Sequence, residues 1–244
     1  MMNNEPQYNA IVIGATGAVG RELVDVLLSS TNYNKVTIFV RRTIERWEKL
    51  SPSKAHKLNI VKVDNLDFLG GTKEELEKRL EGVKYNVVFN CLGSRVGRGD
   101  DEFYRVDYTY VVQSCELCEK LNIPHYSNCS AAKTDPNSCF MYMRVKGQAE
   151  EAISKKNVNY VSIMKPGLIQ DRDNDSRCME KCWGCLCCCM DQISAQNIAR
   201  AMFVDDLEYQ KGEKKDKKVR RITNREMLDM VKTSFTIENN VPVA

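Results

Sequence analysis

The sequence predicts an α/β fold in which helices cover both faces of a doubly wound parallel sheet. Short apolar runs typical of strands alternate with helical patterns along most of the 244 residues, which is typical of a parallel sheet. A glycine-rich turn follows the first of these runs and opens a helical segment, as in Rossmann-type folds. The expected strands are 9–13, 35–40, 59–63, 86–91, 125–128, 160–164 and 219–223.

The helical segments lie between these strands in one domain, residues 1–244, with a small C-terminal portion on the substrate side. Segment 73–80 carries glutamate and lysine at the i, i+3 and i+4 spacing of a solvent-facing helix, and Asn224 is expected to cap the last helix. Residues 168–194 have the least regular pattern and are expected to form a cysteine-rich loop on the substrate side. The expected helices are 21–28, 73–80, 103–122, 142–155, one that begins near residue 195, and 225–233.

Charge and hydropathy restrict the class of partner. Thirty-six basic and 33 acidic residues leave a net charge of +3, which is too balanced to favour nucleic acid, so a small molecule is the expected partner. The N-terminus lacks the basic start and apolar stretch of a signal peptide, and no segment holds about 18 unbroken apolar residues. We therefore expect a cytoplasmic protein without a transmembrane segment, and leave nuclear access and protein partners open.

The eleven cysteines fall into two groups. Five are scattered and expected to be free thiols, because disulfides are rare in a reducing compartment. Six lie between Cys178 and Cys189, and three interpretations stay open: a zinc or iron–sulfur site, reversible lipidation, or a loop without a ligand. We assign no metal ligands, and His56 and His125 have no acidic or thiol partner that the sequence can place. The scattered thiols are Cys91, Cys115, Cys118, Cys129 and Cys139; the clustered ones are Cys178, Cys182, Cys185, Cys187, Cys188 and Cys189.

The turn between the first strand and the first helix is the strongest motif. Gly14 permits a tight turn, Gly17 lets the backbone approach an anion, and Gly20 lets the helix pack closely on the strand. A pyrophosphate placed there meets unpaired N–H groups at the positive end of the helix dipole. The predicted cofactor-binding residues of this turn are Gly14, Ala15, Thr16, Gly17, Ala18, Val19 and Gly20.

The ends of the next strands predict which dinucleotide is bound. The second strand ends in Arg41 and Arg42, at the position where an acidic residue reads a free ribose hydroxyl and a basic one reads a 2′-phosphate, so NADP(H) is favoured over NAD(H). Asp64, with Asn65 beside it, ends the third strand where a carboxylate could meet the adenine amino group. The fourth strand is followed by a turn of small residues beside the expected cofactor, Cys91, Leu92 and Gly93.

A tyrosine and a lysine four residues apart form the second motif. The spacing puts Tyr142 and Lys146 on the same face of a helix, one turn apart. A phenol of pKa ~10 is a poor acid–base catalyst at neutral pH, and a nearby ammonium group favours its ionised form. Ser130 follows the fifth strand, twelve residues earlier, where its hydroxyl could hold a substrate carbonyl.

Together these motifs resemble the atypical short-chain dehydrogenase/reductases, in the branch of the Tat-interacting oxidoreductase and tumour-suppressor proteins. The similar stretches run nearly end to end and include residues 14–20, 91–94, 104–108, 140–147 and 165–168. The resemblance implies a doubly wound sheet that binds NADPH, with Ser130, Tyr142 and Lys146 as the catalytic residues. It adds Pro166, Gly167 and Leu168 to the predicted cofactor contacts.

The chain departs from the family pattern at three places. Asp107 stands where many of these reductases keep an asparagine for a proton-relay water, so the relay is expected to differ or to be absent. Residues 131–133 replace the usual serine and glycine, and the loop after Gly167 becomes the cysteine cluster. The expected function is NADPH-dependent reduction of a carbonyl substrate, and the alternative is an NADPH-binding regulatory protein with little or no turnover.

Overall fold

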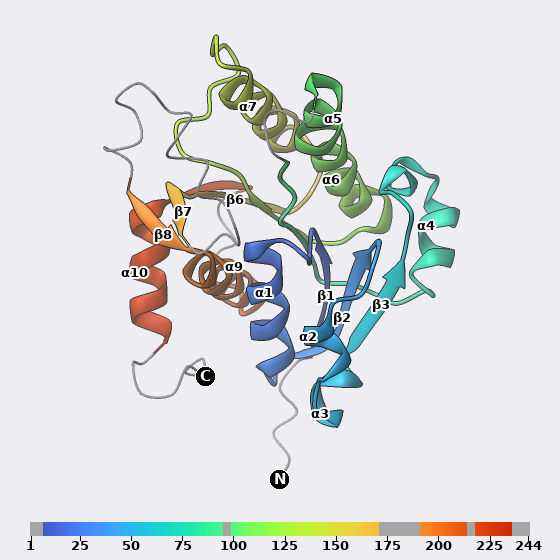
Figure 1. Ribbon diagram of the computed structural model, residues 1–244. Helices are drawn as coiled ribbons and strands as arrows, with labels where there is room; N and C mark the ends of the chain where they lie inside the picture. The colour runs from blue at the N-terminus through green and yellow to red at the C-terminus, as the bar shows by residue number, and fades with distance from the viewer. Residues whose placement is uncertain (1–6, 95–98, 171–190, 214–217, 236–244) are drawn as a thin grey trace.

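The computed structural model describes residues 7–94, 99–170, 191–213 and 218–235. Its centre is a sheet of seven parallel strands in the order β3-β2-β1-β4-β5-β6-β9, and a pair of short parallel strands, β7 and β8, lies beside it (Figure 1). This confirms the predicted doubly wound sheet in one domain. The strands are β1 (Tyr8–Ile13), β2 (Tyr33–Val40), β3 (Leu58–Lys62), β4 (Val87–Asn90), β5 (His125–Cys129), β6 (Tyr160–Lys165), β7 (Leu168–Gln170), β8 (Gln192–Ser194) and β9 (Val219–Thr223).

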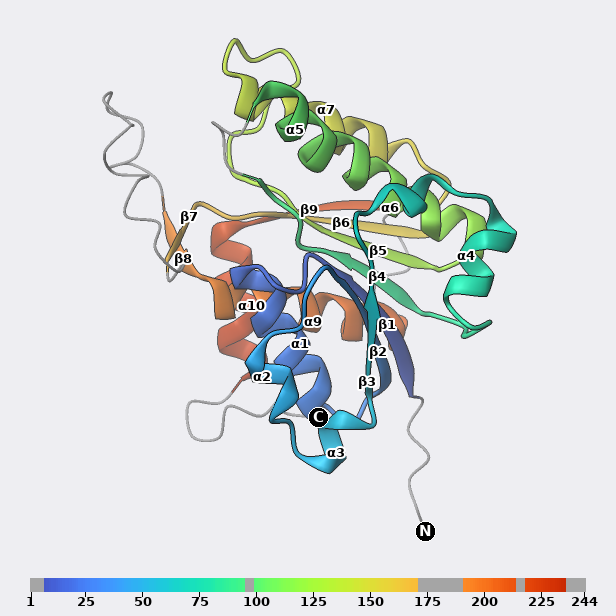
Figure 2. The same cartoon turned by 45° about the vertical axis from the view of Figure 1, so that its right-hand side comes forward.

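Helices cover both faces of the sheet, as Figures 1 and 2 show. One layer holds α4 (Lys73–Arg79), α5 (Asp100–Tyr104), the π-helical turn η2 (Arg105–Thr109), α6 (Tyr110–Leu121) and α7 (Met141–Ser154). The other holds α1 (Ala18–Ser29), α9 (Ala195–Gln210) and α10 (Asn224–Ser234). Three short elements join the strands at one edge: α2 (Glu45–Glu48), α3 (Pro52–Ala55) and the 3₁₀ turn η1 (Asp67–Gly70).

The alternation of side chains along β1 explains why this strand is apolar throughout. Ala10 and Val12 join the core beneath α1 and α9, whereas Ile11 and Ile13 join the core beneath the opposite helix layer. All four are fully buried. A parallel strand that helices cover on both faces has no polar side, so a continuous apolar run is expected for it.

The structure corrects two element boundaries. The predicted helix 103–122 is interrupted by the π-helical turn η2, which lies between α5 and α6. The last helix is capped by Thr223, whose hydroxyl accepts from the Glu226 N–H, and not by Asn224. Asn224 instead turns inward, and its side-chain oxygen accepts from the Gly167 N–H at 3.0 Å.

The segment predicted as an irregular loop, 168–194, has an ordered base. Its two ends pair as β7 and β8, with Leu168 opposite Gln192 and Gln170 opposite Ser194. Strands of three residues are too short to show periodicity in the sequence. The cysteine cluster from Cys178 to Cys189 lies outside the described residues.

The five scattered cysteines are free thiols, as predicted. Cys115, Cys118 and Cys129 are buried, Cys91 is partly exposed and Cys139 is exposed. Burial raises the pKa of Cys91, Cys115 and Cys118 well above the ordinary value of a thiol. These three thiols therefore stay protonated at neutral pH, which makes them poor nucleophiles.

A buried polar cluster joins α9 to the N-terminal ends of four strands. His125 Nδ1 donates to Asp206 Oδ1 at 2.6 Å, and His125 Nε2 lies 2.9 Å from Ser162 Oγ. The Tyr33 hydroxyl donates to the other oxygen of Asp206. The acidic partner that the sequence could not assign to His125 is thus 81 residues away along the chain. The cluster comprises Tyr33, His125, Tyr160, Ser162, Asp205, Asp206 and Arg220.

Candidate cofactor and active site

The turn after β1 needs glycine at two positions. Gly14 has a φ of +80°, and a Cβ there would lie 2.7 Å from the backbone carbonyl of Cys91. A Cβ on Gly20 would lie 2.2 Å from the Gly14 oxygen. Glycine therefore lets the turn lie against the loop after β4 and lets α1 begin directly beneath it.

The N-terminus of α1 is open. Its N-cap residue is Gly17, which has no side chain to bond the first N–H groups of the helix. The first turn of the helix, Ala18 to Arg21, carries one charge, and that charge is positive. A helix end with free N–H groups and a nearby cation attracts an anion.

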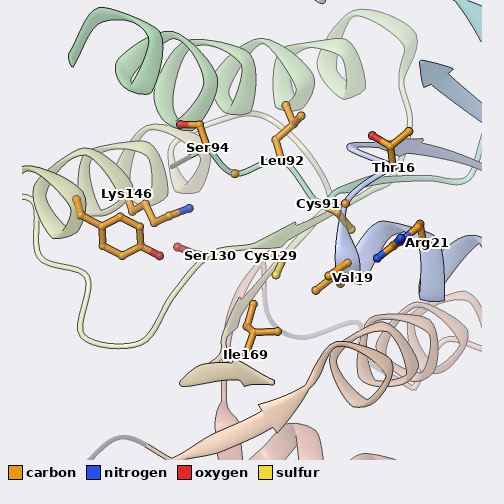
Figure 3. A pocket seen from close by; sticks show the side chains of 14 residues that line it. Thr16, Val19, Arg21, Cys91, Leu92, Ser94, Cys129, Ser130, Lys146 and Ile169 are labelled. Carbon is orange, nitrogen blue, oxygen red and sulfur yellow. The ribbon is translucent and has the colours of Figure 1, made fainter. Parts of the chain in front are cut away.

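A cavity of about 300 Å³ opens over this helix end, at the C-terminal edge of the sheet. It lies where the strand order reverses between β1 and β4, which is where open α/β sheets bind their ligands. In Figure 3, Thr16 and Arg21 lie at one end of the cavity, Ser130 and Lys146 lie at the other, and Ile169 borders it from β7. Its lining residues are Thr16, Gly17, Ala18, Val19, Arg21, Cys91, Leu92, Gly93, Ser94, Cys129, Ser130, Tyr142, Lys146 and Ile169.

The structure brings half of the predicted site residues to the lining of this cavity and leaves the other half outside it. The predicted catalytic residues Ser130, Tyr142 and Lys146 line it together with residues 16–19 and 91–93. Gly14, Ala15 and Gly20 support the turn without lining the cavity. The remaining predicted residues lie outside its lining: Arg41, Arg42, Asp64, Asn65, Pro166, Gly167 and Leu168.

Lys146 is held by a carboxylate. Its Nζ lies 2.8 Å from Asp107 Oδ1 and 5.5 Å from the centre of the Tyr142 ring. The other oxygen of Asp107 accepts from the Ser94 N–H at 2.8 Å and from the Ser94 hydroxyl at 2.6 Å. Burial opposes the charge of Lys146, but the neighbouring Tyr142 and Asp107 raise its pKa above the ordinary value. Lys146 is therefore a cation with an anionic partner.

Ser130 is also engaged with a carboxylate. Its hydroxyl donates to Glu150 Oε1 at 2.5 Å, and the Thr134 hydroxyl donates to the same oxygen at 2.6 Å. Lys165 Nζ lies 2.9 Å from both oxygens of Glu150, which is only 4% exposed. Because a hydroxyl has one proton, Ser130 in this arrangement presents only lone pairs to the cavity.

A second cavity, of about 390 Å³, lies at the ends of β2 and β3. It receives Arg41, Asp64 and Asn65 from the predicted set, and Arg42 does not line it. Arg79 reaches it from α4, with its guanidinium 4.5 Å over the Phe68 ring. The cavity is lined by Arg41, Lys62, Val63, Asp64, Asn65, Phe68 and Arg79, so three cations face one carboxylate.

Sequence reasoning did not assign several residues of these sites. Arg21 directly follows the glycine turn, so its place in the first helical turn was a usable signal. A second usable signal was the position of Glu150, which lies four residues after Lys146 and therefore on the same helical face. Lys62 and Arg79 belong to the predicted strand 59–63 and helix 73–80, and Ile169 belongs to β7, but no local pattern indicates that these side chains reach a cavity.

The chain matches the model of the NAD(P)H-binding family over residues 14–206. Protein HTATIP2 of Rattus norvegicus is 29% identical over 171 residues, which cover 69% of this chain and 66% of that protein. Protein FMP52-2, mitochondrial, of Scheffersomyces stipitis is 26% identical, with 66% of each chain covered. The match thus spans just under two thirds of the length of these two relatives.

Solved structures share the fold at low sequence identity. MoeE5 in complex with UDP-glucose and NAD superimposes with a TM-score of 0.63 at 14% identity, over 93% of this chain and 82% of that one. UDP-N-acetylglucosamine 4-epimerase from Methanobrevibacter ruminantium M1 gives a TM-score of 0.64 at 16% identity, over 89% and 76%. Both support a Rossmann-type architecture.

The comparisons contradict the predicted cytoplasmic location. FMP52 of Saccharomyces cerevisiae, 24% identical over 69% of this chain, is named a mitochondrial protein, as are the relatives from Scheffersomyces stipitis and Candida albicans. The sequence argument failed because it tested only for secretory and membrane-spanning segments. Among the described residues, no helix has the length and apolar character needed to cross a bilayer. By its family match the chain belongs to the NAD(P)H-binding family, and its similarity to HTATIP2 supports the predicted resemblance to the atypical short-chain dehydrogenase/reductases.

Proposed function

We propose that this chain is an NADPH-dependent oxidoreductase that reduces a carbonyl substrate. The observation that carries the proposal is one cavity that joins the open N-terminus of α1 to Tyr142, Lys146 and Ser130. The helix end suits a pyrophosphate, and the phenol beside an ammonium group suits proton transfer. A site with both features suits reduction better than binding alone.

The residues present fit a dinucleotide. The 14–20 turn would hold the pyrophosphate, with Arg21 balancing its charge, and the turn 91–94 would lie beside the nicotinamide. The second cavity would take the adenosine, where Arg41 and Arg79 offer guanidinium groups to a 2′-phosphate. A bound NADPH would supply the hydride.

The chain's own residues would handle the proton. The Tyr142 hydroxyl would donate to the carbonyl oxygen, and Lys146 would stabilise the phenolate that remains. Ser130 would position the substrate oxygen. To donate a hydrogen bond to that oxygen, the Ser130 hydroxyl must first release its hydrogen bond to Glu150. Leu92, Val19 and Ile169 would exclude water from the reacting atoms.

Two measurements on the purified protein test this proposal. Calorimetric titration should show tighter binding of NADPH than of NADH, and a panel of aldehydes and ketones should contain substrates that consume NADPH through many turnovers. Binding of neither dinucleotide would refute the proposal entirely. Tighter binding of NADH would refute the cofactor preference alone.

Replacement of Arg41 by methionine should weaken NADPH binding about tenfold or more, because a charged hydrogen bond to phosphate is lost. NADH affinity should change little, since NADH lacks the 2′-phosphate. The matched control is Arg42→Met, which removes the same charge from the adjacent exposed residue outside the second cavity. Equal losses in the two variants, or an equal loss for NADH, would contradict the assignment of Arg41.

A second candidate function is an NADPH-binding regulatory protein with little or no turnover. The contacts of Lys146 with Asp107 and of Ser130 with Glu150 favour it, because both groups are engaged within the protein. Tight NADPH binding without consumption across the carbonyl panel would support this function. Sustained turnover would exclude it.

A further inference from the structure

A buried carboxylate faces the catalytic helix from the π-helical turn between α5 and α6. Asp107 is 1% exposed, and its two oxygens are divided between two partners. Oδ1 lies 2.8 Å from Lys146 Nζ, and Oδ2 accepts both the N–H and the hydroxyl of Ser94. Three donors therefore hold the carboxylate in one orientation.

The groups that surround the Lys146 ammonium come from three elements. Tyr142 comes from its own helix, Asp107 from η2 and the Cys129 thiol from β5. Asp107 is the carboxylate in ion-pair contact with Lys146, whereas Tyr142 and Cys129 are uncharged in their protonated forms. The pair of Asp107 and Lys146 has no net charge, so it attracts an anion at the Tyr142 hydroxyl less strongly than an unpaired ammonium group would.

We propose that Asp107 is a positioning residue that keeps Tyr142 protonated, by pairing with Lys146 and offsetting its charge. The inference rests on the proposed function, which makes Tyr142 the proton donor. A donor must hold its proton at working pH, and an unpaired ammonium one helical turn away would promote its loss. Asp107 thus biases the site toward giving a proton to a carbonyl oxygen and against taking one from an alcohol.

Asp107→Asn tests the inference without a substrate. The asparagine oxygen can still accept from Ser94, but the side chain no longer carries the charge that offsets Lys146. Tyr142 ionisation is followed in the protein without cofactor by ultraviolet difference titration, with Tyr142→Phe subtracted in each background. The pKa of Tyr142 should fall by about one unit or more, since removal of a nearby like charge has effects of that size.

The control is Asp101→Asn, which removes the same charge from an exposed residue at the start of the same helical stretch and should leave the Tyr142 pKa unchanged. If Asp107→Asn does not fold, Asp107→Ser removes the charge with a smaller side chain and should give the same fall. An unchanged or raised Tyr142 pKa in a folded Asp107 variant would overturn the inference.

A second readout separates this inference from the proposed function. In a carbonyl-reducing enzyme, the alkaline limb of the rate profile reports the loss of the Tyr142 proton, and Asp107→Asn should move it to lower pH. If the wild-type protein reduces no carbonyl compound, the proposed function fails, and the titration of Tyr142 still decides the role of Asp107. A lower Tyr142 pKa with no shift in the rate profile would overturn the inference for catalysis.

Discussion

Tyr142→Phe is expected to lower the rate of carbonyl reduction by about 10² to 10⁴, the usual contribution of a positioned general acid. Only the hydroxyl is removed, so the ring keeps its packing against Phe103, at 5.9 Å between ring centres, and its place beside Lys146. NADPH affinity should therefore change little. Single-turnover consumption of NADPH and calorimetric titration measure the two quantities separately.

The matched control for this variant is Tyr104→Phe. It deletes the same atom from a tyrosine that is 42% exposed and does not line the cavity. Its rate should equal that of the wild type. If Tyr142→Phe also kept the wild-type rate, another group would have to supply the proton, and the mechanism proposed for this site would be wrong.

Asp206→Asn is expected to lower the free energy of unfolding by about 3 kcal/mol, because it breaks a buried hydrogen-bonded cluster. Asp206 is fully buried and accepts from His125, Tyr33 and Gln210. An amide has one acceptor oxygen, so at least one of these donors would face the new NH₂ group. Urea unfolding, monitored by circular dichroism, measures the change.

The control for the stability prediction is Asp229→Asn. This residue lies on α10, and its side chain is 62% exposed, with Lys232 4.0 Å away. Exposed ion pairs of this kind contribute little to stability, so the midpoint of unfolding should hardly move. A loss in Asp206→Asn no larger than in the control would show that the cluster does not stabilise the fold.

The sequence predicted the parts of the structure that depend on local patterns. Each apolar run became a strand of the parallel sheet, and the 14–20 turn took the position between β1 and α1 that its glycines require. These features depend on residues within a few positions of one another. Backbone sterics and side-chain alternation therefore determine them.

The partners of the polar side chains could not be predicted in the same way. His125 and Asp206 are 81 residues apart, and Ser130 and Glu150 are 20 apart, so their contacts depend on how helices pack on the sheet. The spacing of Tyr142 and Lys146 predicted a shared helical face, but it did not indicate that Asp107 forms an ion pair with Lys146. Such contacts are decided by packing, which no local pattern encodes.

The π-helical turn controls which way the helix beyond it faces. A π turn holds about one residue more than an α turn, and each residue advances an α-helix by roughly 100°. A regular α-helix made of the same residues would therefore rotate α5 relative to α6 by roughly 100°. Whether Lys146 meets a carboxylate thus depends on the π-helical geometry of this turn as well as on the aspartate within it.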